Sequence, residues 1–476
     1  MKVLYVSSEA LPFAASGGLA DVAGSLPHAM RRRLIGCRVA MPLYESVPQS
    51  LRENMTFLTS LSVPVAWRRQ YCGVFEAKVD GVIYYLLDNQ YYFKRQGLYG
   101  HYDDAERFAF FSRAVLEMLP YIGLKPDVIH ANDWQSALVP VYYSLFYATR
   151  EGYEGIKTVF TIHNIQYQGK YGMEVLEDVV GVPQSSRQIL EFDGCVNYMK
   201  GGIETADAVT TVSPTYAGEI LDPWFSWGLD PILRERSFKL HGILNGIDTV
   251  GYDPATDPAV FANYTAETAQ EGKAENKRAL QERLSLPQRP DVPLIGMVTR
   301  LASHKGMDLV KYIADELFTR DVQFVLLGSG EWIYENFFRE LQDRYPDRFR
   351  YCVGFLPELA RKIYAAADIF LMPSKSEPCG LAQMVACRYG AVPVVRETGG
   401  LKDSIRDCGD EGGFGFTFKT YNANDMLGAV DRALGAYGDP AFFAELRQRC
   451  MAQDFSWGRS ANEYIRLYRS LLKPHE

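Results

Sequence analysis

The chain has 476 residues, of which 47% are hydrophobic and 23% charged, the balance of a soluble globular protein. This length exceeds one ordinary hydrophobic core, so we expect two domains. The formal net charge of −8 argues against a nucleic-acid-binding surface, and no apolar run approaches the length of a membrane span. The eight cysteines include no C-x-x-C pair and the first residues lack a signal-peptide pattern, so we expect no disulfide framework, no zinc site and a cytoplasmic location.

The first element is an apolar strand at residues 2–7, followed after a short link by paired glycines and a helix-forming run at 16–22 (SGGLADV). A strand, a glycine turn and a helix N-terminus in this order allow the backbone to approach a diphosphate closely. The glycines, Gly17 and Gly18, are adjacent, so the pattern is not the G-x-G-x-x-G dinucleotide fingerprint. An ordinary tight turn between a strand and a helix explains the same residues.

Strands and helices alternate along the first half of the chain. Helical patterns are clearest at 105–119 and 135–149. Apolar strands are expected near residues 3–6, 39–42, 82–87, 128–130, 158–162 and 208–212. The polar stretch 248–271, rich in Pro, Asp and Thr, then indicates a connection between two domains.

The alternation restarts in the second half, with apolar strands expected at 294–298, 322–327, 351–353, 369–372 and 392–395. This pattern predicts an α/β fold with two doubly wound domains, each a parallel sheet covered by helices, facing each other across a cleft. The apolar residues of 456–472 recur at helical spacing, which predicts an amphipathic helix with no strand after it. That helix could pack on either domain.

A single carboxylate, Glu377, lies between the strand 369–372 and a helix-competent run at 381–389. In an open α/β sheet, the carboxyl end of a strand facing a helix N-terminus is where ligands bind, and free N–H groups there favour a phosphate. Glu377 is therefore placed to act on a substrate, while the amides of Gly380, Leu381 and Ala382 face its phosphate. A helix cap or a surface loop explains the same pattern equally well.

Several motifs occur in order from the first strand to the last domain: 16–22 SGGLADV, 95–100 RQGLYG, 107–111 RFAFF, 130–134 HANDW, 161–169 TIHNIQYQG, 244–248 LNGID, 299–301 TRL, 304–306 HKG, 373–374 PS, 377–381 EPCGL and 398–401 TGGL. Several are weak alone, but their order is highly specific. Together the chain resembles the bacterial glycogen synthases and plant starch synthases over essentially its whole length.

The resemblance implies a GT-B architecture of two Rossmann-like domains. The acceptor-side domain would span 1–247, with a C-terminal helix at 456–476 packing back on it, and the nucleotide-sugar domain would span 248–455. The family reaction transfers glucose from ADP-glucose to the non-reducing end of an α-1,4-glucan with retention of configuration. The implied partners are therefore ADP-glucose and the glucan polymer. No cofactor is implied, and no Asp-x-Asp suggests a metal-bound donor.

By resemblance the catalytic residues are Glu377, His163, Arg300 and Lys305. Transfer leaves a diphosphate anion, which fixed cations and oriented amides stabilise in a site that excludes water. Arg300 and Lys305 would otherwise be ordinary solvated charges, and His163 an ordinary core histidine. The implied substrate-binding residues, several of which are also plausible caps or turn residues, are Ser16, Gly17, Gly18, Asp21, Asp133, Asn164, Asn245, Cys379, Gly380, Leu381 and Ala382.

The chain departs from the family pattern in two places, and a third position separates it from relatives outside the family. Ala15 and Ser16 stand where many bacterial members carry Lys-Thr, which removes a cation from the diphosphate site and puts the choice between ADP and UDP donors in doubt. Gln135 follows Trp134, where the family often has histidine. Val385 stands where many retaining relatives outside the family carry a second glutamate, which supports the glycogen and starch branch.

Two other function classes stay open: a related retaining GT-B glycosyltransferase with a different donor or acceptor, and a weakly active glucan-binding scaffold. The 30 tyrosines and 26 phenylalanines would supply sugar platforms to such a scaffold, although these residues more often form a core. The sequence leaves the oligomeric state, the preferred chain length of the acceptor and any allosteric control open.

Overall fold

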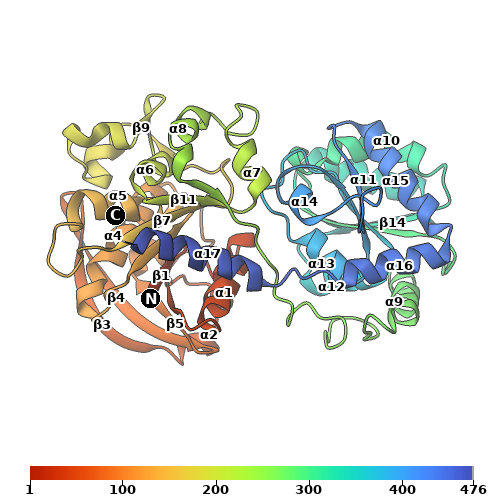
Figure 1. Cartoon of the computed structure of the whole chain (residues 1–476), viewed down its shortest axis with the longest axis horizontal. Helices are drawn as coiled ribbons and strands as arrows, with labels where there is room; N and C mark the ends of the chain where they lie inside the picture. Colours follow the sequence, from red (N-terminus) through yellow and green to blue (C-terminus); the bar gives the residue numbers. More distant parts are fainter. Residues whose placement is uncertain (474–476) are drawn as a thin grey trace. The chain divides into compact units, whose positions relative to one another are not determined.

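The computed structural model describes residues 1–473 and divides into two compact units (Figure 1). The N-terminal unit comprises Met1–Gly246 together with the chain from Trp457, and the C-terminal unit comprises Ile247–Ser456. Each unit has its own sheet and its own apolar interior. Within residues 1–473, no helix is both long enough and apolar enough to cross a membrane.

The sheet of the N-terminal unit has the strand order β12-β11-β7-β6-β1-β2-β5-β4-β3. From β12 to β5 all neighbours are parallel, and every strand expected in this half of the chain forms. Side chains of the central strands are almost all buried, as in a parallel sheet covered on both faces. The parallel strands are β1 Lys2–Val6, β2 Gly36–Pro42, β5 Val82–Asp88, β6 Val128–Asn132, β7 Lys157–Ile162, β11 Ala208–Thr211 and β12 Leu240–Gly242.

At one edge this parallel sheet continues into two strands that the sequence did not reveal: β3 (Thr56–Val65) and β4 (Arg68–Val79) form an antiparallel hairpin on β5. Their turn is Ala66–Trp67, with Ala66 at a φ of 51°. Hairpin turns of this kind usually contain Gly, Asn or Asp, so the sequence carried no turn signal here. The alternation of buried and exposed residues along 60–65 was the signal that could have revealed the hairpin.

The helix expected at 135–149 forms as three consecutive pieces. A 3₁₀ turn at Trp134–Ser136 leads into α5 (Leu138–Tyr142), which continues as a π-helical turn at Tyr143–Tyr147. The other helix expected in this half, 105–119, forms as α4. With their bounds, this helix and the others of the unit are α1 Gly18–Arg31, α2 Gln49–Arg52, α3 Gln90–Phe93, α4 Asp104–Tyr121, α6 Tyr198–Thr205, α7 Pro214–Glu219 and α8 Asp230–Glu235, with further helical turns at Leu176–Val180, Gln184–Ile189 and Ser237–Lys239. A small antiparallel sheet contains β8 Lys170–Tyr171, β9 Glu191–Phe192 and β10 Cys195–Asn197.

The last helix, α17 (Trp457–Leu472), belongs to the N-terminal unit, and Figure 1 shows it in blue beside elements from the start of the chain. It contacts α1, and just beyond the end of α1 Arg33 Nε donates to Asn462 Oδ1 at 2.6 Å. Tyr468 is fully buried, and its hydroxyl lies 2.6 Å from Nδ1 of His130 in β6. The apolar stripe of α17 therefore covers the sheet of this unit. Residues 474–476 of the expected helix lie outside the described residues.

The C-terminal unit has a fully parallel sheet in the order β15-β14-β13-β16-β17-β18. All strands expected here form, and β18 adds an edge strand that the sequence did not reveal. The strands are β13 Leu294–Val298, β14 Gln323–Gly328, β15 Phe349–Val353, β16 Ile369–Met372, β17 Val392–Arg396 and β18 Phe416–Phe418. The helices are α9 Ala269–Arg283, α10 Met307–Leu317, α11 Trp332–Arg344, α12 Pro357–Ala366, α13 Ala382–Arg388, α14 Gly399–Ser404, α15 Ala423–Tyr437 and α16 Pro440–Met451, with a 3₁₀ turn at Ser303–Lys305.

Candidate active site

In the C-terminal unit, Glu377 follows β16 and Lys305 lies in the turn after β13, the neighbouring strand. Lys305 Nζ donates to Oε2 of Glu377 at 2.7 Å and to Oε1 at 2.9 Å, and Ser374 Oγ donates to Oε2 at 2.9 Å. The Glu377 side chain is buried. Burial raises its pKa, but the ammonium of Lys305 and the hydroxyl of Ser374 outweigh burial and lower it below its usual value. Glu377 is therefore an ionised carboxylate.

The loop after Glu377 is held by two neighbouring segments. Gln383 Nε2 donates to the carbonyls of Cys379 at 3.1 Å and Gly380 at 2.9 Å, and Gly380 has a φ of 69°. The Gly400 amide donates to the carbonyls of Glu377 at 3.2 Å and Pro378 at 3.1 Å. This brings the expected Cys379, Gly380, Leu381 and Ala382 together at the start of α13.

The paired glycines of the 398–401 motif pack directly on the backbone of this loop. A Cβ on Gly399 would lie 1.9 Å from the carbonyl oxygen of Glu377, and one on Gly400 would lie 2.0 Å from that of Cys379. No side chain fits at either position, so both residues must be glycine for the loop to lie where it does. These contacts give the motif a role that sequence reasoning missed.

Arg300 also follows β13, but its side chain is exposed and makes no ion pair within residues 1–473. Lys305 therefore forms an ion pair with Glu377, whereas the guanidinium of Arg300 is open to solvent. His304 lies between them in the chain, and burial, Lys305 and Arg300 together lower its pKa. A neutral His304 leaves the positive charge of this turn on Lys305 and Arg300.

In the N-terminal unit, the paired-glycine loop precedes α1, with Gly17 at its N-cap and Gly18 as its first residue. Both glycines and Ser16 are exposed, and Asp21 lies in the first turn of the helix. The buried carboxylate of Glu9 accepts a hydrogen bond from the Ser16 amide, and burial raises its pKa. Glu9 thus fixes the loop by binding the backbone of Ser16. Sequence reasoning missed this contact, although a carboxylate shortly after β1 could be seen in the sequence.

His163 and Asp133 are joined through the backbone. Asp133 Oδ1 accepts from the amides of His163 at 2.7 Å and Asn164 at 3.4 Å, and His163 Nε2 lies 2.8 Å from Oδ1 of Asn132. Burial lowers the pKa of His163 to about 3, so the ring is neutral. Burial also raises the pKa of Asp133 to about 7, against the two amides that lower it. Asp133 makes no side-chain cap on the following turn, so the capping explanation is wrong.

Asn245 follows β12 and is 5% exposed. Its side-chain oxygen accepts no hydrogen bond within residues 1–473, which is costly for a buried polar atom. A ligand donor at this point would satisfy it.

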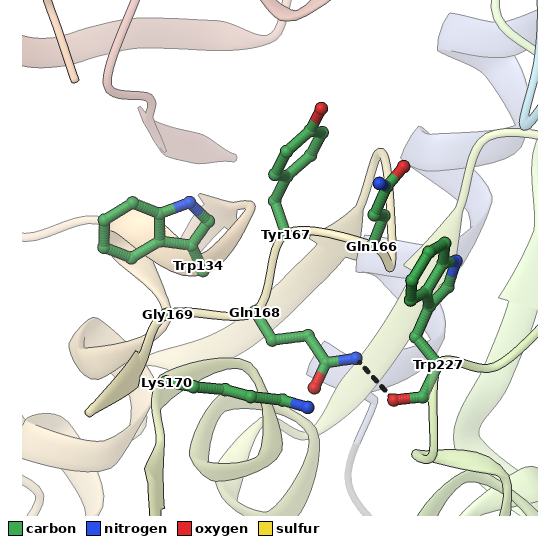
Figure 2. A pocket seen from close by; sticks show the side chains of 7 residues that line it. All are labelled: Trp134, Gln166, Tyr167, Gln168, Gly169, Lys170 and Trp227. Carbon is green, nitrogen blue, oxygen red and sulfur yellow. Dashed lines mark hydrogen bonds between the residues drawn. The ribbon is translucent and has the colours of Figure 1, made fainter. Parts of the chain in front are cut away.

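The N-terminal unit also contains a hollow of about 310 Å³ that sequence reasoning did not foresee (Figure 2). The rings of Trp134, Tyr167 and Trp227 stand around it, and Gln168 Nε2 donates to the carbonyl of Trp227 at 3.2 Å. Its lining is completed by Gln166, Gly169 and Lys170. Aromatic faces with a few amide and ammonium groups suit a sugar, whose rings have apolar faces and polar edges.

The predicted site residues thus fall into two groups. Lys305 and Glu377 are in direct contact within the C-terminal unit, as are Asp133, His163 and Asn164 within the N-terminal unit. Within residues 1–473, no cluster of His, Cys, Asp and Glu side chains is arranged to hold a metal ion.

Comparison with known proteins matches both halves of the chain. Residues 2–235 match the family described as starch synthase catalytic domain, and residues 280–452 match glycosyl transferases group 1. The glycogen synthase of Geobacillus thermodenitrificans is 50% identical over 480 residues, covering 100% of this chain and 99% of the relative. The glycogen synthase of Bacillus cereus (strain ATCC 10987 / NRS 248) is 47% identical, covering 99% of this chain and 100% of the relative. The chain belongs to the glycogen and starch synthase family.

Solved structures agree with this membership. The catalytic domain of starch synthase IV from Arabidopsis thaliana, bound to ADP and acarbose, is 36% identical with a TM-score of 0.92, covering 99% of each chain. The sucrose-phosphate synthase of Thermosynechococcus elongatus is 17% identical with a TM-score of 0.61, covering 99% of this chain and 98% of that one, and it supports the fold alone. The two parallel-sheet α/β domains expected of the glycogen and starch synthase family are thereby confirmed.

The structure also reveals a candidate nucleotide-binding residue that sequence reasoning missed. Phe355 is 91% exposed and comes directly after β15 and Gly354, whose φ is 117°. It therefore lies at the carboxyl edge of the sheet that also carries Glu377, where ligands of open α/β sheets bind. An exposed aromatic ring at this edge can stack on a nucleotide base.

Proposed function

We propose that the protein is a glycogen synthase, which transfers glucose from ADP-glucose to the non-reducing end of an α-1,4-glucan with retention of configuration. Membership of the glycogen and starch synthase family, with 50% identity over the full chain, supports this reaction. The observation that carries it is the ion pair between Lys305 and the buried Glu377, at the carboxyl edge of the C-terminal sheet. The proposal includes a cytoplasmic location, where nucleotide sugar and glucan would both be available.

In the proposed reaction, the C-terminal unit binds the nucleotide sugar. The exposed guanidinium of Arg300 and the ammonium of Lys305 balance the charge that develops on the diphosphate as the glycosidic C–O bond breaks. The amides at the start of α13 add oriented dipoles. Glu377 is ionised, so it stabilises the positive charge that develops on the glucose ring. Phe355 supplies a platform for the adenine.

The N-terminal unit supplies the acceptor side. The glucan lies in the hollow formed by Trp134, Tyr167 and Trp227, with Asp133, Asn164 and Asn245 offering polar contacts. We also assign the paired glycines and Asp21 to donor binding, and His163 to a hydroxyl of the donor glucose. The relative bound to ADP and acarbose, a nucleotide and an oligosaccharide mimic, supports this pair of ligands for the present chain.

Retention follows from attack on the same face that the diphosphate leaves. The acceptor hydroxyl oxygen bonds to the anomeric carbon, the bond from that carbon to the diphosphate oxygen breaks, and the hydroxyl proton passes to the departing phosphate. The reaction yields a glucan one glucose longer and ADP. This route needs no covalent intermediate on Glu377, whose charge stays available to the ring throughout.

One assay tests the proposal. Nucleotide release is measured from ADP-glucose and from UDP-glucose, each with glycogen as the acceptor, and product length is followed by chromatography. We expect ADP release with elongation of the glucan. Faster turnover of UDP-glucose would refute the donor, elongation of neither would favour a glucan-binding scaffold, and transfer to another acceptor would favour a different glycosyltransferase.

A further inference from the structure

The imidazole of His163 makes a side-chain hydrogen bond to Asn132, the last residue of β6. Nε2 of the ring and Oδ1 of the amide are 2.8 Å apart, and Asn132 is fully buried. Asn132 belongs to the 130–134 motif, but the proposed function gives it no part. Its contacts nevertheless decide which nitrogen of His163 carries the proton.

The orientation of the Asn132 amide is fixed by its neighbours. Nδ2 donates to the carbonyls of Val6 at 3.0 Å and His130 at 3.2 Å. A carbonyl oxygen only accepts, so the nitrogen of the amide must face these two groups. Oδ1 then faces the hydroxyl of Tyr5 at 2.9 Å and Nε2 of His163, and both must donate to it.

A neutral imidazole carries one proton, and this network puts it on Nε2. Burial lowers the pKa of His163 to about 3, so a second proton is not bound near neutral pH. The titratable groups nearby do not change this. His130 is neutral for the same reason, burial raises the pKa of Tyr5, and Asp133 contacts only the backbone amide of His163. Nδ1 therefore holds a lone pair, and it accepts no hydrogen bond within residues 1–473.

We propose that Asn132 is a positioning residue that locks His163 in the tautomer protonated at Nε2, so that Nδ1 accepts a hydrogen bond from a hydroxyl of the donor sugar. The sugar contact rests on the role given to His163 in the proposed function, whereas the tautomer rests on the network alone. With the tautomer fixed, the sugar hydroxyl must donate to the ring. Its own lone pairs stay available to other donors in the site.

The tautomer of the full-length enzyme can be measured directly. The protein is produced with ¹⁵N-histidine, and the ring nitrogen shifts of His163 are assigned by their loss in His163→Gln. We expect protonated Nε2 and unprotonated Nδ1 from about pH 5 to 8. A ring protonated at Nδ1, or an imidazolium at pH 7, would overturn the proposal without any variant having to fold. A correct tautomer in an enzyme that transfers no glucose would refute only the proposed function.

A pair of variants tests the consequence for activity. Asn132→Leu keeps the branching and number of side-chain heavy atoms but removes the side-chain hydrogen bonds, and we expect mixed tautomers and a fall in kcat of about tenfold or more, with KM for glucan changed less than about twofold. Thr210→Val is the matched control, because Thr210 is equally buried in the same sheet and bonds to Thr161, not to Asn132 or His163. We expect it to keep both the tautomer and kcat. A folded Asn132→Leu enzyme that also keeps both would overturn the proposal.

Discussion

Lys305 Nζ lies 2.7 Å and 2.9 Å from the two carboxylate oxygens of Glu377, so one ammonium holds both oxygens although 72 residues separate the two side chains in the chain. Both side chains are largely shielded from water. Removing one partner of such a pair leaves the other charge without compensation, which costs more than the pair itself contributes to stability. The two residues therefore have to be interpreted as one electrostatic unit.

Glu377→Gln should lower kcat by about two to three orders of magnitude, because the amide cannot balance positive charge on the glucose ring. The shape of the side chain is kept, and the variant should fold with a lower melting temperature because Lys305 loses its counter-charge. ADP release with glycogen as acceptor measures the effect. Glu340→Gln, an exposed carboxylate on α11, is the control and should behave as the wild type. Turnover close to that of the wild type in the Glu377 variant would show that the assignment is wrong.

Phe355→Ala should raise KM for ADP-glucose about tenfold with a smaller effect on kcat, since stacking on a base contributes about 1–3 kcal/mol. The wild-type ring is 91% exposed, so little packing is lost and the melting temperature should stay the same. Phe238→Ala removes an equally large ring that is 77% exposed in the N-terminal unit, and it serves as the control. Equal KM values in the two variants would exclude Phe355 from the nucleotide site.

Asp133→Asn should change how stability depends on pH. The pKa of Asp133 is raised to about 7 in the folded protein, whereas in the unfolded chain it is near 4. Below about pH 4 the carboxyl is protonated in both states, so Asp133 makes its full contribution to the free energy of unfolding. As the pH rises from about 4 to about 7, only the unfolded state ionises readily, and the wild type loses on the order of 4 kcal/mol of folding free energy, because the two pKa values differ by about 3 and each pH unit corresponds to about 1.4 kcal/mol. Asparagine keeps the acceptor oxygen and does not ionise.

Melting temperatures measured from pH 5 to 8 should therefore diverge in favour of the Asp133→Asn variant and run parallel above about pH 8. Asp343→Asn, at an exposed carboxylate on α11, should show no such divergence. If the difference in melting temperature between the variant and the wild type were constant from pH 5 to 8, Asp133 would be ionised in the folded protein over that whole range.

Ala15→Lys should tighten binding of ADP-glucose about tenfold if the diphosphate site lacks a cation. Ala15 is exposed beside Ser16 and Gly17, so the longer side chain fits without repacking. The affinity for ADP is measured by calorimetry and KM for the donor by ADP release. An unchanged affinity would show that another basic residue already supplies the charge.

The sequence predicted the α/β class and the parallel strands well, because buried parallel strands are continuous apolar runs. β13 and β16 begin and end where the apolar residues do. The β3–β4 hairpin was missed because its turn at Ala66–Trp67 uses residues that ordinarily avoid turns. Local pattern also failed for the helix at 135–149, whose first and last turns have 3₁₀ and π geometry.

For the candidate site, too, the sequence identified some residues but not the contacts between them. The local strand–helix pattern pointed to Glu377, and resemblance supplied Lys305 and His163, but no local pattern could show that Lys305 binds Glu377. A contact between separate segments, such as Asn132 with His163, depends on which strands become neighbours. Phe355 was missed for a different reason: an aromatic residue in a sequence gives no sign of whether its ring is buried.

The position of α17 sets the order in which the protein can be completed during synthesis. The N-terminal unit begins at Met1 yet needs Tyr468 against His130 and Asn462 against Arg33, so its last helix leaves the ribosome only after all of Ile247–Ser456. The C-terminal unit is continuous in the chain and can fold first as a whole. Until α17 has been synthesised, the apolar faces of β6 and α1 that it covers stay exposed to solvent. A chain that stops before Trp457 should therefore damage the unit that was made first.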